Sequence, residues 1–407
     1  MIRSRDFRLV FVMYVSMAFV LQGLASSPAW AVEGPGTVRS KADSTVRVAA
    51  AQPINRTIAF QVSPVDALER VDETLVALEQ LVAQAGAREC DVLAFPEDTL
   101  GLLHWEAANP EIIDQVLPVA VDRMLTRLGK AAAKHNMYLV VCNDTIDGDG
   151  RLYNMAFLIG REGDEIGRYR KVNLPMTERS RARGTSFPVF PTPDLGTVGM
   201  LICYDMVFPE SARALALQGA DLVFHPTLGG AAIGDEDISL AAFRTRAVEN
   251  FVYLVVANRG QGSMIIAPSG KILATADGPD SIAIVDIDPH GGREAGDAMN
   301  RQADMRGRLF RERVPEAYQI LTELEPPVLD KVSSNVTTEE AIRIMETVLT
   351  TGEARFNEAM ALSRSGRTEE AIRLFEQLCN ECRTSWIDRA SRIQLDKLRG
   401  QISPARP

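Results

Sequence analysis

The sequence predicts an α/β fold in which helices pack on the faces of β-sheets, with a small all-α extension at the C-terminus. Between residues 46 and 288, short apolar and β-branched runs alternate with longer segments whose apolar residues recur every three or four positions. This alternation is typical of strands and amphipathic helices in one domain. Several strand candidates are apolar almost throughout, as strands buried on both faces are. After residue 336 the pattern is helical only.

The first 31 residues read as a separate N-terminal segment. Three arginines precede an uncharged apolar run (residues 9–24), and small residues then lead to Ala31. These are the three parts of a secretory signal peptide, so we expect cleavage after Ala31 and export to the periplasm or the cell exterior. The alternative is an N-terminal membrane anchor, for which this apolar run is short. A polar linker, residues 32–44, follows.

The main domain is predicted to span residues 45–325. Its strand candidates, in chain order, are 46–52, 91–97, 137–144, 152–160, 197–205, 221–227, 251–258, 263–269 and 281–288. Amphipathic helices are predicted at 66–86, 118–135 and 209–219. The strands 137–144 and 152–160, joined by "IDGDGR", have the spacing of a hairpin, which predicts mixed rather than purely parallel sheets.

A linker, residues 326–335, leads to the helical extension at 336–407. In that extension Gly366 ends one helical pattern and Thr368 begins the next. The pair resembles a single tetratricopeptide-type (TPR-like) unit. Because such repeats usually need about three units for stability, the alternative is an appendage that closes an edge of the main domain or makes a dimer contact.

Charge and cysteines limit the classes of function. The net charge of −10 provides no basic surface for nucleic acid. Of the five cysteines, Cys90 and Cys142 lie in or beside apolar strands and are expected to be core thiols. Cys379 and Cys382 form a CxxC pair that would be a disulfide or part of a metal site. We expect no metal there, because no second pair and no histidine lie nearby.

Cys203 is the candidate nucleophile. It lies where the apolar run "TVGMLIC" ends, before a turn that contains Pro209. A free thiol is a weak nucleophile and needs a base, yet none of the four histidines lies in a motif like that of papain-like enzymes. Glu97 follows a buried strand, and its apolar surroundings are expected to raise its pKa toward that of a general base. The ammonium of Lys171, in "GRYRKVNLP", would favour a thiolate and hold an oxyanion.

At these residues the sequence resembles the nitrilase superfamily of carbon–nitrogen hydrolases. "LAFPEDT" is similar to the glutamate motif of that family, "RYRKVNLP" to its lysine motif and "GMLICYDMVFPESARALALQGADLV" to its cysteine motif, in the family's order. "MRGRLFRERVPEAYQIL" resembles the arm that closes the family's domain. The resemblance covers roughly residues 45–324. It implies a four-layer α-β-β-α sandwich that usually dimerises through one helical face, so we expect a homo-oligomer.

The resemblance also implies roles for individual residues. Glu97 would be the base, Lys171 the oxyanion stabiliser and Cys203 the nucleophile, with the backbone N–H of Tyr204 as a second oxyanion donor. Glu178 is a candidate fourth catalytic residue. It lies seven positions after Lys171, whereas eight is the spacing expected in amidase-like members, and Arg179 occupies that position.

Three further residues have two interpretations each. His225 and Thr227 follow a strand on the cysteine side, where they would either line a substrate pocket or pack as hydrogen-bonded core residues. Asp205 is expected to fix the loop after Cys203 rather than to touch substrate.

The sequence therefore predicts a hydrolase that cleaves a non-peptide carbon–nitrogen bond through a cysteine thioester, with no cofactor or metal. We expect a small-molecule amide or N-carbamoyl substrate more than a nitrile, because amide-type activities are the commoner ones across the resembling family. The alternative is a catalytically silent or acyl-transferring scaffold whose helical tail binds a protein partner. The presence of all three catalytic residue types argues against that alternative.

Overall fold

The computed structural model describes most of the chain after residue 44. The described residues are 45–175, 178, 180–229, 236–293, 304–331, 352, 355–381 and 386–402. The predicted signal peptide and linker, residues 1–44, lie outside them and stay predictions. So do Arg179, Cys382 and residues 336–351 of the predicted extension. Within the described ranges, no helix combines the length and the apolarity needed to cross a membrane.

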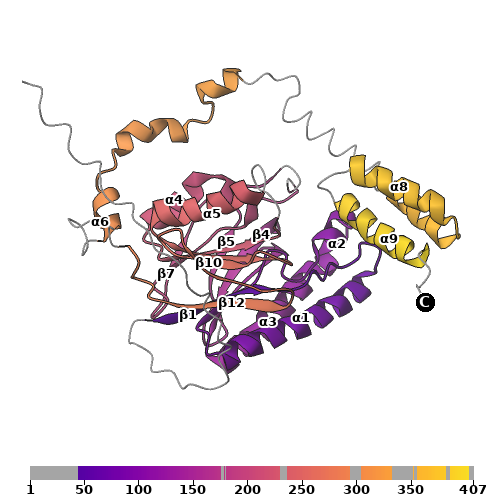
Figure 1. Ribbon diagram of the computed structural model, residues 1–407, viewed down its shortest axis with the longest axis horizontal. Helices are drawn as coiled ribbons and strands as arrows, with labels where there is room; N and C mark the ends of the chain where they lie inside the picture. Colours follow the sequence, from indigo (N-terminus) through magenta and orange to yellow (C-terminus); the bar gives the residue numbers. More distant parts are fainter. Residues whose placement is uncertain are drawn as a thin grey trace, which may run out of the picture. The chain divides into compact units, whose positions relative to one another are not determined.

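Two six-stranded sheets form the centre of the fold (Figure 1). The first has the order β12 (Ser281–Ile287), β1 (Val46–Gln52), β2 (Val92–Ala94), β3 (Tyr138–Ile146), β4 (Leu152–Ile159), β5 (Glu165–Arg170). The second has the order β11 (Ile272–Thr275), β10 (Met264–Ile266), β9 (Tyr253–Asn258), β8 (Leu222–Thr227), β7 (Thr197–Met200), β6 (Val189–Pro191).

The two sheets repeat one pattern of pairing. In the first sheet β1, β2 and β3 are parallel, and β12, β4 and β5 extend them in antiparallel fashion. In the second sheet β7, β8 and β9 are parallel, with β6, β10 and β11 as the antiparallel strands. Both sheets are therefore mixed, as the predicted hairpin indicated. The repeat also gives β2 and β8 equivalent central positions.

Helices cover the outer face of each sheet and complete four layers (Figure 1). The helices α1 (Pro64–Ala87) and α3 (Leu117–His135) bury residues such as Leu75 and Met124 on the first sheet. The helices α4 (Pro209–Leu217) and α5 (Glu236–Asn250) cover the second sheet. A third apolar cluster, which includes Val140 and Phe224, fills the space between the sheets. The predicted α-β-β-α sandwich is confirmed.

Local differences from the sequence prediction have physical causes. The run 197–205, predicted as one strand, ends at Met200, and a 3₁₀ turn, η3 (Cys203–Val207), takes its place. The run 91–97 is shorter too, because β2 ends at Ala94 and the chain then turns. The short strands β5, β6 and β11 were not predicted, because charged or Pro-bounded runs of three to six residues carry little apolar periodicity.

The segment 305–331, which follows β12 of the first sheet in the chain, has little regular structure and is exposed. It contains α6 (Met305–Leu309) and the 3₁₀ turns η4 (Pro315–Thr322) and η5 (Pro327–Lys331), and it has no buried residue among those described. Many of its large apolar side chains are exposed, Leu324 to 95%. We call residues 305–331 the arm.

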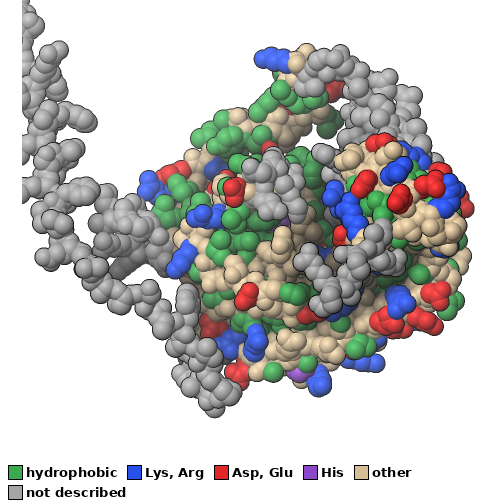
Figure 2. Space-filling view, turned by 45° about the vertical axis from the view of Figure 1, so that its right-hand side comes forward, with side chains coloured by type: hydrophobic (Ala, Val, Ile, Leu, Met, Phe, Trp, Pro, Cys, Tyr) green, Lys and Arg blue, Asp and Glu red, His purple; other side chains and the backbone are tan. Residues whose placement is uncertain are grey.

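The described C-terminal part is helical, as predicted. Residues 355–364 form a helix, followed by α8 (Thr368–Glu381) and α9 (Trp386–Ile402). Their apolar faces form a cluster with Phe60 of the main domain, and the ring of Phe356 meets that of Phe60 edge-on at 5.2 Å. The outer face of these helices mixes Lys and Arg with Asp and Glu (Figure 2).

Candidate active site

The three predicted catalytic side chains meet where several strands of both sheets end. Glu97 lies in the turn after β2, Lys171 directly follows β5, and Cys203 begins η3 after β7. Glu97 Oε1 accepts a hydrogen bond from Lys171 Nζ at 2.9 Å. The Cys203 thiol lies within hydrogen-bonding reach of the Glu97 carboxylate. The chain thus brings together residues that are far apart in sequence.

Two tight turns present the acid and the thiol. Cys203 has φ of 42° and Asp98, next to Glu97, has φ of 52°. Side chains other than glycine rarely adopt this left-handed geometry, and it is typical of strained functional turns. Asp98 holds its turn by accepting the N–H groups of Leu102 and Leu103 at 2.7 and 3.1 Å.

Arg259, in the loop after β9, ties the glutamate turn to the second sheet. Its guanidinium pairs with the carboxylate of Asp98 at 3.0 Å and donates to the backbone carbonyl of Glu97 at 3.2 Å. Both side chains of the pair are buried. A buried pair of this kind fixes the relative position of two loops, because its charges lose their partners if either loop moves.

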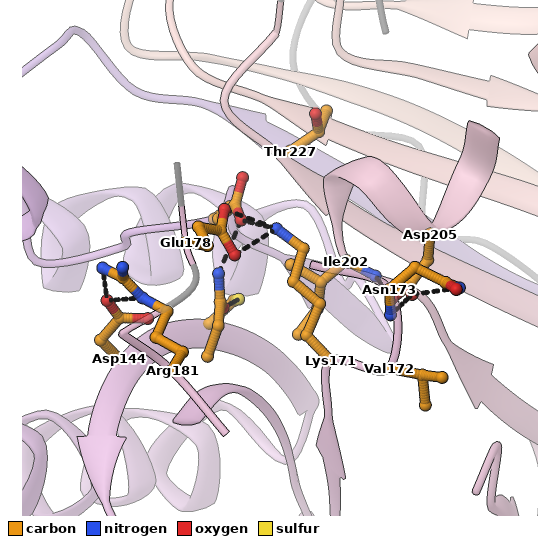
Figure 3. A network of polar contacts seen from close by, with 12 residues as sticks. Asp144, Lys171, Val172, Asn173, Glu178, Arg181, Ile202, Asp205 and Thr227 are labelled. Carbon is orange, nitrogen blue, oxygen red and sulfur yellow. Dashed lines mark hydrogen bonds and ion pairs between the residues drawn. The ribbon is translucent and has the colours of Figure 1, made fainter. Parts of the chain in front are cut away.

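Asp205 fixes the cysteine turn, as predicted. Its Oδ2 accepts the N–H of Ile202 at 3.0 Å and the hydroxyl of Tyr169 at 2.6 Å. Its Oδ1 accepts both the backbone and side-chain N–H groups of Asn173, each at 2.9 Å. One carboxylate therefore links η3 to the segment that carries Lys171 (Figure 3).

Glu178 also reaches the lysine, although its spacing from Lys171 is one residue shorter than expected. Lys171 Nζ donates to Glu178 Oε1 at 2.8 Å and to Oε2 at 2.9 Å, and the figure shows the two side chains pointing toward one another (Figure 3). Lys171 is fully buried, and both of its carboxylate partners are nearly so. Burial alone would lower the pKa of Lys171, but the two carboxylates raise it well above its usual value, so the group stays an ammonium.

The structure adds Asn154, which the sequence did not indicate. Its side-chain amide donates to Glu97 Oε1 at 2.8 Å, and its backbone carbonyl accepts the N–H of Lys171 at 2.9 Å. Asn154 lies within β4, in an otherwise apolar run, and an isolated polar residue there was the only signal in the sequence.

Protonation states follow from burial and charge. Burial, together with the nearby charge of Glu97, raises the pKa of Cys203 to about 12. Burial alone would raise the pKa of Glu97, but the Lys171 ammonium and the hydrogen bonds from Lys171 and Asn154 bring it below its usual value. The expectation of a raised pKa for Glu97 was therefore wrong, because the sequence showed the apolar surroundings but not the lysine beside the carboxylate. The resting site holds a neutral thiol next to an ionised glutamate.

The remaining predicted site residues lie close to this centre. The side chain of Thr227, at the end of β8, is buried close to the Cys203 thiol. His225 is buried two residues earlier, with its ring 5.3 Å from that of Phe243, and burial lowers its pKa to about 4. Tyr204 follows Cys203 in η3, where its ring packs edge-on against Phe208. The roles of His225, Thr227 and the Tyr204 N–H stay predictions.

Among the described residues, no group of three His, Cys, Asp or Glu side chains has the arrangement of a metal site. What the centre offers chemically is a thiol, a carboxylate within reach of its proton, and a fixed positive charge. This set can carry out nucleophilic attack with proton transfer and oxyanion stabilisation.

Comparisons with known proteins agree with this geometry. Residues 47–297 match the family model described as carbon-nitrogen hydrolase. The chain is 26% identical over 286 residues to an N-carbamoylputrescine amidase of Arabidopsis thaliana, covering 63% of this chain and 92% of that protein. It is 30% identical over 261 residues to a nitrilase of Pyrococcus abyssi, covering 61% and 93%.

A solved structure is similar as well. It is a mutant of the amidase from Nesterenkonia sp. AN1 that carries the product of acrylamide addition at its active-site cysteine. The TM-score is 0.50 at 26% identity, and the match covers 60% of this chain and 93% of that one.

Proposed function

The chain belongs to the carbon–nitrogen hydrolase family, and we propose on that basis that it hydrolyses amide or N-carbamoyl groups of small molecules through a cysteine thioester. The observation that carries the proposal is the contact of one buried ammonium, Lys171, with the carboxylate that faces the Cys203 thiol. A scaffold without activity has no use for such a costly buried arrangement.

In the first half of the reaction Cys203 Sγ attacks the carbonyl carbon while Glu97 takes the thiol proton. The carbonyl oxygen becomes an oxyanion that Lys171 and the N–H of Tyr204 stabilise. The carbon–nitrogen bond then breaks as Glu97 gives its proton to the leaving nitrogen. Ammonia or an amine departs, and the acyl group remains on sulfur as a thioester.

In the second half a water molecule attacks the thioester carbon and Glu97 takes its proton. A second oxyanion forms and collapses with cleavage of the carbon–sulfur bond. Glu97 returns the proton to the sulfur, and the carboxylic acid, or the carbamic acid from a carbamoyl group, leaves. Glu178 supports both halves by keeping Lys171 in place and charged.

The names of the relatives support amide-type substrates over nitriles. Two of the three proteins described above are amidases, and one of these is named for an N-carbamoyl compound. The match covers nearly all of each relative, so the compared region is the whole catalytic unit of those proteins. The helical C-terminal part lies beyond that region.

Intact-protein mass spectrometry with a panel of small amides, N-carbamoyl amines and nitriles tests the proposal. We expect an acyl adduct on the wild-type chain that Cys203→Ala abolishes. Cys90→Ala is the matched control, because Cys90 is a buried core thiol and its removal should leave the adduct in place. If no panel member gives an adduct or turnover and a thiol reagent labels Cys90 as readily as Cys203, the proposal fails.

Replacing the base gives a second test. Glu97→Gln keeps the shape of the side chain but cannot take the thiol proton, so kcat should fall about 10²–10⁴-fold. An activity close to that of the wild type would exclude Glu97 as the base.

A further inference from the structure

We propose that Arg181, Asp144 and Glu106 form a buried assembly that positions Glu178 against Lys171, with Arg181 as its central positioning residue. The inference rests on the proposed function, because it assigns a task within the same site. None of these three residues touches the reacting atoms. Arg181 and Asp144 lie on the far side of Glu178 from Lys171 (Figure 3).

The first step is the anchoring of the Arg181 side chain. Arg181 Nε donates to Asp144 Oδ2 at 2.6 Å, and its Nη2 pairs with the same oxygen. Nη2 also lies 3.6 Å from Glu106 Oε2. Asp144 belongs to β3 and Glu106 to α2 (Leu103–Ala108), and all three side chains are buried. The guanidinium therefore joins its own loop to a strand and to a helix.

The second step leads from Arg181 to Glu178. The N–H of Arg181 donates to the carbonyl of Glu178 at 2.9 Å, and the N–H of Glu178 donates to that of Pro175 at 2.9 Å. These two bonds tie Arg181 to Glu178 and Glu178 to Pro175, which lies four residues after Lys171. The Glu178 side chain itself hydrogen-bonds to Lys171. The anchored Arg181 therefore holds the backbone of Glu178 in place.

The third step is the role of Glu106, which is set by charge. Two carboxyl groups face one guanidinium, and Glu106 Oε1, Glu106 Oε2 and Asp144 Oδ1 are buried without a hydrogen-bond partner among the described residues. The two carboxyl groups lie within hydrogen-bonding reach of each other. Two ionised carboxylates at that distance repel strongly, whereas a single shared proton removes the repulsion and satisfies both oxygens.

The surroundings agree with a proton on Glu106. Burial and the charges of Asp144 and Asp98 raise the pKa of Glu106 well above its usual value, although the charge of Arg181 opposes them. A neutral Glu106 donates to Asp144 and leaves Asp144 and Arg181 as one compensated ion pair. That pair holds its geometry without adding net charge behind Glu178.

A double-mutant cycle between Arg181 and Glu178 tests the assignment in the full-length chain. Arg181→Met should lower kcat about 100-fold through displacement of Glu178. Arg181→Lys should lie between wild type and Arg181→Met, because a single ammonium cannot reproduce the several N–H donors of the planar guanidinium. If Arg181 acts through Glu178, adding Arg181→Met to Glu178→Gln should cost little more than Glu178→Gln alone. Losses that multiply in the double variant would overturn the proposal.

Two matched variants of Glu106 test whether this residue is protonated. Glu106→Met removes the donor to Asp144 and should reduce activity. Glu106→Gln should be about tenfold more active than Glu106→Met, because its amide N–H replaces the shared proton. If Gln is as damaging as Met, Glu106 is an ionised carboxylate and this part of the assembly is wrong.

A readout without substrate separates the two proposals. The pH profile of Cys203 alkylation by iodoacetamide, followed by mass, reports on Glu97, Lys171 and Glu178 whatever the substrate is. If the cycle is non-additive in alkylation while no amide is turned over, the positioning assignment survives and the proposed function fails. Additive effects in alkylation overturn the assignment even if amides are hydrolysed.

Discussion

Before any substrate binds, the proton of the Cys203–Glu97 pair lies on the sulfur. The thiol, with a pKa raised to about 12, keeps the proton, and the glutamate, with a lowered pKa, is ionised. The site therefore differs from one that stores a ready thiolate beside a positive charge. In the proposed mechanism the nucleophile forms only as the proton moves to Glu97, so the position of that carboxylate would control the rate.

Glu178 and Glu97 should titrate separately on the acid side of the pH profile of kcat/KM. The pKa of Glu178 is raised by burial, with the charge of Lys171 only partly offsetting it, and that of Glu97 is lowered. As the pH falls, Glu178 therefore takes a proton first and the grip on Lys171 weakens. We expect kcat/KM of the wild type to decline through this raised pKa. In Glu178→Gln the remaining acid limb should move to lower pH, where Glu97 titrates.

The measurement is kcat/KM against pH for both chains, with Cys203 alkylation as a parallel series. The shape of the curve is compared, not its height, because Glu178→Gln also lowers the rate. Superimposable acid limbs would show that Glu178 does not set the acid side of the profile.

At the scale of elements, Asp205 joins the cysteine turn to the lysine segment. Its carboxylate oxygens accept four hydrogen bonds from three residues, and it is fully buried. Asp205→Asn turns one acceptor into a donor that faces other donors, so we expect a loss of about 2 kcal/mol in the free energy of unfolding and a fall in kcat.

Tyr169→Phe is the matched control for Asp205→Asn. It removes one of the four hydrogen bonds without adding a donor, and also the 3.2 Å bond that the N–H of Val172 donates to the Tyr169 hydroxyl, and it should cost about 1 kcal/mol. Denaturant unfolding measures both variants. Equal costs for the two would mean that Asp205 is not the link between η3 and the lysine segment.

A second junction of elements depends on two glycines. A Cβ on Gly129, in α3, would lie 2.4 Å from the carbonyl oxygen of Gly163, in the turn between β4 and β5. Gly129→Ala must therefore push the helix away from that turn, and we expect a loss of about 1–3 kcal/mol in unfolding free energy. Gly148→Ala is the control, because no atom lies within 4 Å of its added Cβ. Equal midpoints in denaturant for the two variants would contradict the close packing.

Elements with strong apolar periodicity could be predicted from the sequence, whereas short elements and the weakly amphipathic 15-residue α5 could not. The strand β1 and the helices α1 and α3 have strong periodicity, and their predicted ends agree within two residues. The helix α2 was not predicted, because six residues are too few for a helical period to appear. Yet it carries Glu106.

The candidate site shows the same limit. Glu97, Lys171 and Cys203 were found because each lies in a motif. Asn154, Arg181 and Arg259 were not, because their roles arise from partners on other segments, Glu97, Asp144 and Asp98 respectively. A single sequence shows such residues only as polar positions between apolar ones.

At the scale of the whole molecule, the arm (residues 305–331) exposes a series of large apolar side chains, and gathered apolar side chains on a surface mark interaction sites. Val314, Ile320, Leu321, Leu324 and Val328 are each more than half exposed. We propose that a second copy of the chain covers them, in keeping with the homo-oligomer expected from the sequence.

Light scattering coupled to size-exclusion chromatography measures the molar mass of the protein in solution and so its oligomeric state. Wild type should elute as an oligomer, and Leu321→Asp with Leu324→Asp should lower its mass toward that of one chain. Val65→Asp is the control, since Val65 is an exposed apolar residue of α1, outside the arm. A monomeric wild type, or an equal effect of the control, would contradict a role of the arm in assembly.

The contact of Phe60 with the rings of Phe356 and, through it, Phe375 ties an early loop to the last helices of the chain. During translation this loop emerges long before its covering helices, since ribosomes add about 5–20 residues each second. The nascent chain must therefore carry an uncovered Phe60 ring until synthesis is nearly complete. A prematurely terminated product would keep that ring uncovered permanently and present it to chaperones and proteases.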